Sequence, residues 1–571
     1  MEQSLSLVSA ESQKRVLYVD SVDDLRDVLI NADTPTTAIT KGYYSPNDGG
    51  GFEYNYDTLM SQADDGFFYI RSSGMIQGGW SPNIKDEVNI KIAGAVADGS
   101  TDNLNSFNTL DNHVENIYMP KGIYAVSGFL SLTNISNIRA EKGVKIIYTG
   151  SEVEYFIKLP VKSIVIDGNG LVVDGNDKAS KGLYMVSDQN IDVTVDHITI
   201  QNCAQTENKG LSSGIILQGD YNTIDIRNTE IHNITSSVTS GGASRGIYIS
   251  DRDTDQISQV RISNCLIDTV TVSGSASNDA DGIYVQMADT YNNDTLIEGC
   301  SFSNCGKGSI KTQCRQVTIT NNFFNGALEE AMHEIRIQRG RGLVSNNQLV
   351  YNTLYPPNTV FEVLIPDNGK ISPVEISNNM LVNYKTANIN KFCIVGGGST
   401  NVSSKNAYYL HHNVLMSSFK SMFYFYGKGN TNNTYRNIDN FNFSNNIIKN
   451  ITDELFLLGR GVGVGYTVNY RADVLNNNIL TANSAKLATA QAPGVYFTIN
   501  LFVNNNNISR SIDTINSPII ARTQEFLYPG AGSSSKRPMG VYTGYQFFDT
   551  TLNKPIYWDG NNWVDSAGTS V

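Results

Sequence analysis

The chain has 571 residues, of which only 17% are charged, and its formal net charge is -13. An acidic chain without a basic face is not expected to bind nucleic acid, so a neutral or specifically recognised ligand is favoured. The first residues carry no basic segment followed by an apolar run, and no stretch approaches the ~18 consecutive apolar residues of a membrane span. We therefore expect no ordinary signal peptide, no membrane insertion, and folding in a cytosol.

Two short helices are expected before the main body of the chain. The stretch "SVDDLRDVLINA" (21–32) predicts a helix inside a small α+β segment, and "TDNLNSFNTLDNH" (101–113) predicts an N-capped helix. The second helix is suited to covering the open end of a solenoid, where strand edges would otherwise be unpaired. We assign residues 1–88 to an N-terminal cap or attachment segment.

A short signature then returns along the chain: an apolar residue, any residue, Asn, and then Asn or Cys. Its copies are "IQNC" ending at Cys203, "ISNC" at Cys265, "IEGC" at Cys300, "ITNN" at Asn322, "VSNN" at Asn347, "ISNN" at Asn379, "FSNN" at Asn446 and "LNNN" at Asn478. "LHHN", ending at Asn413, fits between them with His412 in place of the first Asn. With the degenerate copy "IRNT" at Thr229, the interval is about 22 to 36 residues, the length of one solenoid coil. Asn tolerates the left-handed backbone that closes a tight turn.

Short strands separated by such turns predict an all-β, right-handed parallel β-helix over residues 89–525. Inward positions of successive coils form columns, which explains Cys at one equivalent position of three coils. We expect all six cysteines to be reduced and mostly buried, and we expect no metal and no cofactor. After about residue 525 the signature stops, and residues 526–571 are predicted to form a linker and a small Tyr/Trp-rich β module.

Three stretches resemble bacteriophage tailspikes with a pectate-lyase-like β-helix. "KGYYSPNDGGGFEYNYD" (41–57) resembles the segment that precedes such helices, and "NIKIAGAVADGSTDNLNSF" (89–107) resembles the motif that opens the first coil, with Ala97 in place of Gly and Asn103 in place of Asp. "RPMGVYTGYQFFDTTLNKPIYWDGNNWVDSAGTSV" (537–571) is similar to a C-terminal module of phage tail proteins.

The resemblance implies a homotrimeric protein of the virion that recognises a host and cleaves capsular or O-antigen polysaccharide at the bacterial surface. Other phage tail proteins are implied as partners. The motifs themselves are structural, so no catalytic residue is carried over from them.

The strands that open five successive coils align as "GIILQ" (214–218), "GIYIS" (246–250), "GIYVQ" (282–286), "SIKTQ" (309–313) and "EIRIQ" (334–338). Because side chains alternate across a strand, one Ile of each points inward and three columns are predicted to face solvent. These columns are Gly214, Gly246, Gly282, Ser309 and Glu334; Ile216, Tyr248, Tyr284, Lys311 and Arg336; and Gln218, Ser250, Gln286, Gln313 and Gln338.

This surface is predicted to be a polysaccharide-binding track. Tyr248 could stack on a sugar ring, Gln286 and Gln313 could bind hydroxyls, and Lys311 with Arg336 could bind a carboxylate. Long turns at residues 232–245 and 268–281 would wall the track, and they add Arg245 and Asp279 as binding candidates. The alternative is a solvated face whose ladders only stabilise the stack.

Hydrolysis of a glycosidic bond usually needs two carboxyls, and we assign them to Asp281 and Glu334, about 9.6 Å apart if they lie two rungs apart. "NDADGI" (278–283) and "CGKGSI" (305–310) loosely resemble segments of polygalacturonases, with Lys307 in place of their His. His333 is a further candidate acid or base.

Two alternatives stay open. A polysaccharide lyase would use Tyr284 or His333 as the base, with Arg336 or Lys311 neutralising a uronate carboxylate. A tail fibre or adhesin would bind polysaccharide without cleaving it.

Overall fold

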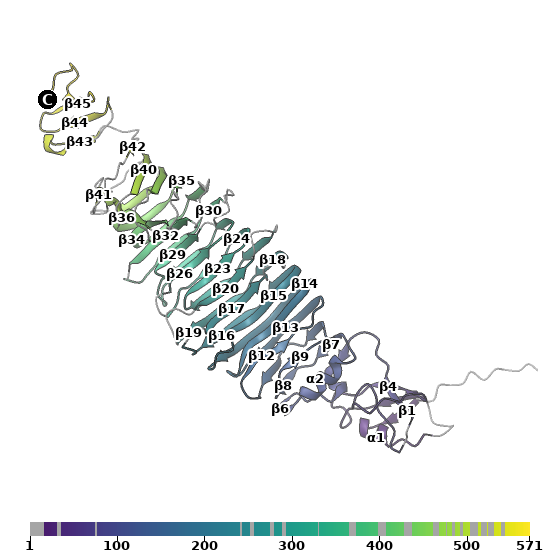
Figure 1. The fold of residues 1–571 in the computed structure, drawn as a ribbon. Coiled ribbons are helices and arrows are strands. Elements are labelled where there is room, and N and C mark those ends of the chain that lie inside the picture. The colour runs from purple at the N-terminus through teal and green to yellow at the C-terminus, as the bar shows by residue number, and fades with distance from the viewer. Residues whose placement is uncertain are drawn as a thin grey trace, which may run out of the picture.

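The computed structural model describes residues 16–30, 36–74, 77–239, 242–251, 256–273, 279–287, 293–328, 331–364, 373–386, 388–397, 407–427, 437–460, 468–475, 477–481, 486–490, 495–502, 512–514, 522–523, 530–537 and 543–571. They form an elongated rod, with the N-terminal elements at one end and the C-terminal strands at the other (Figure 1). Among these residues, no helix is both long enough and apolar enough to span a membrane.

The N-terminal part is a small four-stranded sheet with one helix. Its elements are β1 (Val16–Val19), α1 (Val22–Arg26), β2 (Thr37–Thr40), β3 (Glu53–Asp57) and β4 (Gly79–Pro82). β1 and β2 are parallel and the other pairs antiparallel, around a core that includes Tyr54 and Trp80. The α+β expectation is confirmed, but α1 is shorter than residues 21–32 and ends at Arg26.

The β-helix begins at β5 and consists of three strips of parallel strands. The first strip contains β9 (Leu130–Ser131), β12 (Val153–Lys158), β14 (Ala179–Gln205), β15 (Leu211–Arg227), β17 (Ala243–Ser250), β20 (Ala280–Gln286), β23 (Gly308–Gln313), β26 (His333–Ile337), β29 (Thr359–Leu364), β32 (Ile389–Gly397), β34 (Val414–Gly427), β36 (Ile447–Arg460), β39 (Lys486–Ala490) and β41 (Ile512–Thr514). This strip carries the candidate site.

The other two strips complete each coil. The second contains β5 (Val88–Asn89), β7 (Asn116–Met119), β10 (Asn137–Ala140), β13 (Ile164–Asp174), β18 (Ile257–Ser263), β21 (Asp294–Glu298), β24 (Gln316–Thr320), β27 (Arg341–Ser345), β30 (Val374–Ser377), β33 (Ala407–His411), β35 (Asn437–Ser444), β37 (Val468–Leu475), β40 (Val495–Phe502) and β42 (Arg522–Thr523). The third contains β6 (Asp98–Asp102), β8 (Gly122–Val126), β11 (Val144–Tyr148), β16 (Glu230–Ser236), β19 (Leu266–Val272), β22 (Ser301–Cys305), β25 (Phe323–Phe324), β28 (Gln348–Tyr351), β31 (Met380–Asn383) and β38 (Asn478–Thr481). Long strands such as β14 and β15 run through more than one strip.

All of these pairings are parallel, and the crossover rule for parallel strands makes the coil right-handed. The helix α2 (Leu104–Asp111), preceded by the 3₁₀ turn η1 (Ile90–Ala93), covers the first coils, and its Phe107 and Leu110 join the main core. Asn103 stands at its N-cap but does not cap it, because its amide instead bonds Val96, Thr101 and Ala125. The predicted parallel β-helix is confirmed.

The turns confirm the role predicted for Asn. Left-handed backbone (positive φ) occurs at the first Asn of the signature, or at the residue that replaces it, in Asn202, Asn228, Asn264, Gly299, Asn321, Asn346, Asn378, His412 and Asn445. The final copy was aligned one residue too late, because Asn477 and not Asn478 takes the place of Asn446 in the next coil. All six cysteines are buried, as expected. The expectation that three of them share one position is wrong for Cys203, because the register aligns it with Ile234, Val270 and Cys305 and not with Cys265 and Cys300.

The second Asn of the signature forms a buried ladder along the core. This asparagine ladder consists of Asn322, Asn347, Asn379, Asn413, Asn446 and Asn477. In each of the first five, the backbone N–H and the side-chain amide both donate to the Oδ1 of the next Asn at 2.8–3.1 Å. Each amide of the first five also donates to a backbone carbonyl, so these polar groups are satisfied inside an apolar core.

The C-terminal module follows the last coil. It contains β43 (Gly530–Gly532), the 3₁₀ turn η2 (Ser534–Lys536), β44 (Gln546–Asp549), β45 (Lys554–Trp558) and β46 (Trp563–Val564) in one sheet order. Tyr545, Phe547, Ile556 and Trp563 form its core, and Trp558 packs against them. These aromatic residues therefore pack the small β module at this end of the chain.

Replacing Asn379 by Ala should destabilise the coil strongly. The change leaves the buried N–H groups of Asn347 without their acceptor, at about 1–3 kcal/mol for each unsatisfied group. The thermal unfolding midpoint should fall well below that of Asn222→Ala, a matched change of an exposed Asn that bonds Asp192. Equal midpoints for the two variants would contradict a structural role of the ladder.

Candidate functional site

Two of the three predicted outer columns are present in the predicted register. Along the first strip, Tyr248 pairs with Tyr284, Tyr284 with Lys311, and Lys311 with Arg336. In the other column Ser250, Gln286 and Gln313 stand in line, and the side chains of Gln313 and Gln338 contact each other. The inward Ile column is also confirmed, with each member at most 1% exposed.

The column of Gly214, Gly246, Gly282, Ser309 and Glu334, here called the corner column, faces the core and not solvent. A Cβ on Gly246 would lie 3.0 Å from the Ile267 side chain, and one on Gly282 would lie 2.9 Å from Cys305 Sγ. The strand bends at this position, so the corner residue and the Ile after it both point inward. The strict alternation that we assumed is therefore wrong at the corner.

Glu334 is consequently a core residue. Its carboxyl accepts hydrogen bonds from the Ser309 hydroxyl and, at 2.9 Å, from the Tyr351 hydroxyl. Burial raises its pKa to about 7, against the lowering effect of these two hydrogen bonds. The expectation that Glu334 lies beside Asp281 on the outer surface is wrong.

The bend has a second effect, because it turns the residue before each corner outward beside the aromatic and basic column. Arg245, Asp281 and His333 occupy this position, in β17, β20 and β26, and Asp279 directly precedes β20. The wall that we predicted from long turns is thus partly strand. Glu329, Glu330 and residues 274–278 lie outside the described residues.

Asp279 and Asp281 share one cation. The Lys311 ammonium lies 2.7 Å from Asp279 Oδ2 and 3.9 Å from Asp281 Oδ2, while Arg245 lies 3.8 Å from Asp279. The Asp279 side chain is 41% exposed, whereas that of Asp281 is 1% exposed. We call these two residues the acid pair.

The two members of the acid pair are in opposite electrostatic situations. Burial raises the pKa of Asp281 to about 6, although Lys311 opposes the shift, and neither carboxylate oxygen has a hydrogen-bond partner among the described residues. Burial also disfavours ionisation of Asp279, but its hydrogen bond to Lys311 and the nearby charges outweigh this and lower its pKa. Near neutral pH, Asp279 is ionised and Asp281 retains a proton far more readily.

The two tyrosines of the track are covered by cations. Their rings stack at 5.4 Å, and the Arg245 guanidinium lies 4.1 Å from the Tyr248 ring and 4.5 Å from the Tyr284 ring. Lys311 lies 4.5 Å from the Tyr284 ring, and both tyrosines are at most 9% exposed. The expectation that these ring faces are open to a sugar is wrong, although the Tyr248 hydroxyl bonds Gln286 at the surface at 3.1 Å.

Glu362 is a site residue that sequence reasoning missed. It follows Arg336 in the same column, in β29, and its Oε2 accepts from Arg336 Nε at 3.0 Å. Burial raises its pKa, against the charges of Arg336 and Lys311. Aligning one further coil, "VFEVL" (360–364), would have placed it in this column.

His333 lies beside Glu362, at the edge of the group that Glu362 forms with Arg336 and Lys311. Its Nδ1 is 3.8 Å from Glu362 Oε2, and neither ring nitrogen makes a hydrogen bond within the described part of the chain. Burial and the neighbouring Arg336 and Lys311 lower its pKa to about 3, so the ring is neutral. Gly308 lies next to it, and a Cβ there would meet His333 Nε2 at 2.5 Å, so only glycine leaves room for the imidazole.

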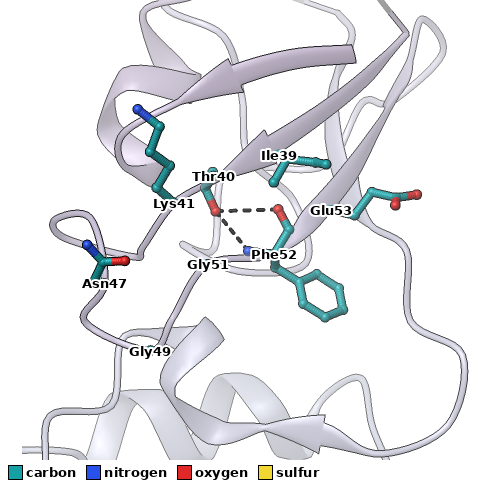
Figure 2. A pocket seen from close by; sticks show the side chains of 8 residues that line it. All are labelled: Ile39, Thr40, Lys41, Asn47, Gly49, Gly51, Phe52 and Glu53. Atoms are coloured by element: carbon teal, nitrogen blue, oxygen red, sulfur yellow. Dashed lines mark hydrogen bonds between the residues drawn. The ribbon is translucent and has the colours of Figure 1, made fainter.

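A separate surface pocket belongs to the N-terminal sheet (Figure 2). Its lining comes from β2, the following turn and the start of β3, namely Ile39, Thr40, Lys41, Asn47, Gly49, Gly51, Phe52 and Glu53. The Thr40 hydroxyl accepts from the Phe52 backbone N–H at 3.0 Å and so ties the two strands together. The pocket has one carboxylate and shares no residue with the acid pair. In the described ranges, no group of three or more His, Cys, Asp or Glu side chains is arranged to hold a metal ion.

No family model matches the chain, and no curated protein matches its sequence. Among solved structures, tailspike protein 3 of bacteriophage CBA120 is 15% identical with a TM-score of 0.40, covering 87% of this chain and 72% of that one. The gp42 tailspike of Acinetobacter phage vb_AbaP_AS12 is 12% identical with a TM-score of 0.40, covering 96% and 88%. The tailspike gp49 of Acinetobacter baumannii bacteriophage Fri1, a capsular polysaccharide depolymerase, is 13% identical with a TM-score of 0.25, covering 88% and 76%. These three structural neighbours are phage tailspikes, each with low sequence identity to this chain.

Replacing Glu334 by Gln should change how stability depends on pH. Because the folded pKa of about 7 lies above the ordinary value of 4.5, the folded chain keeps a proton that the unfolded chain has released between these values. Wild-type stability therefore falls as pH rises through this window, by up to about 3 kcal/mol from this group. Glu334→Gln removes that contribution.

The measurement is the thermal unfolding midpoint of both proteins at pH 5 and pH 8. The variant should gain on the wild type at pH 8 relative to pH 5. A constant difference between the two proteins across this range would show that Glu334 is not a buried, titrating group.

Proposed function

We propose that the chain is a depolymerase that binds and cleaves bacterial capsular or O-antigen polysaccharide as an endo-acting glycoside hydrolase. The observation that carries this proposal is the acid pair: one exposed and one buried carboxylate that converge on Lys311 beside a row of Gln side chains. Two carboxyls in different environments are what glycosidic hydrolysis needs. The opposite pKa shifts of the pair fit this need, because one carboxyl holds a proton more readily and the other stays ionised.

In this mechanism Asp281 is the general acid. It transfers its proton to the glycosidic oxygen as the bond from that oxygen to the anomeric carbon breaks. Asp279 is the ionised partner, which stabilises the positive charge that develops on the sugar and accepts a proton from the attacking water. Lys311 keeps Asp279 ionised through its hydrogen bond of 2.7 Å.

The remaining candidates bind and position the sugar. Gln286 and Gln313 present amides to hydroxyl groups, and the Tyr248 hydroxyl holds Gln286. Arg336, fixed by Glu362, offers a guanidinium edge to an acidic or polar substituent. Arg245 acts through the tyrosines that it covers and through Asp279.

Hydrolysis is favoured over β-elimination by the state of the two candidate bases. Burial raises the pKa of Tyr284 to about 12, although Arg245 opposes this, so the phenolate that a lyase needs is hard to form. His333 has a pKa of about 3 and is a weak base.

The proposed location is a phage tail, where the chain would act at the bacterial surface as a homotrimer. The resemblance of residues 41–57, 89–107 and 537–571 to tailspikes supports this location.

Asp279→Asn and Asp281→Asn should each lower kcat by about 10²- to 10⁴-fold, the usual contribution of a general acid or base. The assay follows new reducing ends released from a panel of capsular polysaccharides. Asp167→Asn, a change of an exposed carboxylate on β13, is the matched control and should cleave like the wild type. Cleavage at the native rate by either acid-pair variant would remove that residue from the mechanism, and an unsaturated uronate in the products would decide for a lyase.

The pH profile of kcat/KM should be bell-shaped. Because Asp281 must be protonated, activity should fall as pH rises through about 6. On the acid side, activity should be lost only below the ordinary titration range of an aspartate, because the pKa of Asp279 is lowered. A profile that still rises between pH 6 and pH 8 would argue against Asp281 as the acid.

A further inference from the structure

Three aromatic side chains form a partly exposed group along the first strip, several coils before the acid pair. Phe129 lies 5.3 Å from Tyr155 in an edge contact, and Tyr155 stacks on Tyr184 at 5.4 Å with 19° between the rings. Phe129 is 48% exposed, and the two tyrosines are half-buried. We call these three residues the aromatic ladder.

The strand register places the aromatic ladder in line with the acid pair. Tyr155 occupies the same column as Asp281, through Lys181, Ser213 and Arg245. That distance is four rungs, or about 19 Å at the usual spacing of strands.

Tyr184 belongs to the aromatic and basic column, because the register aligns it with Ile216, then Tyr248, and then Tyr284. One straight strip of the surface therefore joins the aromatic ladder to the site of cleavage.

The aromatic rings at the two ends of this strip differ in how exposed they are to a ligand. Tyr248 and Tyr284 are covered by Arg245 and Lys311, so their faces are not open to a ligand. The aromatic ladder ends in the exposed ring of Phe129. The most exposed of these five rings, Phe129, thus lies away from the acids, and it is suited to packing against the C–H face of a sugar.

The polar surroundings of the aromatic ladder suit an uncharged sugar residue. The Lys181 ammonium lies 5.8 Å from the Tyr184 ring and donates to Glu154 at 2.8 Å and to the Lys209 carbonyl at 3.1 Å. Its charge is therefore balanced by Glu154, whose side chain is 53% exposed and can still accept from a hydroxyl.

We propose that the aromatic ladder is a remote subsite, which binds an uncharged pyranose residue of the same polysaccharide chain that the acid pair cleaves. The inference rests on the proposed function, since it takes the ligand to be the substrate. The subsite adds affinity only when the sugar chain is long enough to reach both places. A short oligosaccharide centred on the acids does not touch it.

The test replaces Phe129 and Tyr155 by Ala, singly and together. For the intact polysaccharide, KM should rise about tenfold or more in the double variant while kcat stays within about twofold, as expected for the loss of binding energy remote from the reacting bond. For the shortest oligosaccharide that the wild type cleaves, KM should not change. Tyr409→Ala, a change of a 44% exposed tyrosine on β33 in a different strip, is the control and should have no effect on either substrate.

The proposal is overturned if KM for long and short substrates rises equally, if neither changes, or if the double variant alters the oligomeric state instead. Binding of the intact polymer is measured separately on an Asp279→Asn background, so that slow cleavage does not hide it. If the wild type binds polysaccharide without cleaving it and the double variant loses that binding, the proposed hydrolase function fails while the remote subsite stands.

Discussion

The structure depends on one constraint, the in-register parallel hydrogen bonding of each coil to the next. This pairing brings equivalent residues of successive coils about 4.8 Å apart, so a chemical group placed once per coil becomes a continuous column. Inside, the result is a column of Ile and a ladder of Asn whose amides bond one another. Outside, the result is a strip on which tyrosines, cations and carboxylates follow one another along the axis.

The corner column adds a local rule to this constraint. At Gly246 and Gly282 there is no room for a side chain, and the bend there brings Arg245 and Tyr248, three residues apart, to the same outer face. In the next coils the same position holds Ser309 and Glu334, which fill the interior with a hydrogen-bonded pair. A single backbone feature thus decides that Asp281 faces Lys311 on the outer side of the strip while Glu334 is locked in the core.

The sequence was sufficient for the coil architecture, the left-handed Asn turns and the register of two outer columns, because each of these follows from a repeated local pattern. It was not sufficient at the corner, since strict alternation places Glu334 outside and nothing in "GIYVQ" marks the bend. Burial also could not be read from the pattern: Asp281 lies two residues from Asp279, yet one is buried and the other exposed. Glu362 was missed for a simpler reason, because the alignment stopped one coil too early.

Because every coil adds the same rise, the number of coils sets the distance between two places on the strip. Each coil contacts only its neighbours, so removing or inserting one whole coil between β14 and β20 would leave the aromatic ladder and the acid pair intact while changing their separation by about 4.8 Å. A solenoid with two such places on one strip can therefore match a polymer of a different repeat length without any change in either place. The distance between the two places is set by the number of coils between them and not by the residues that bind.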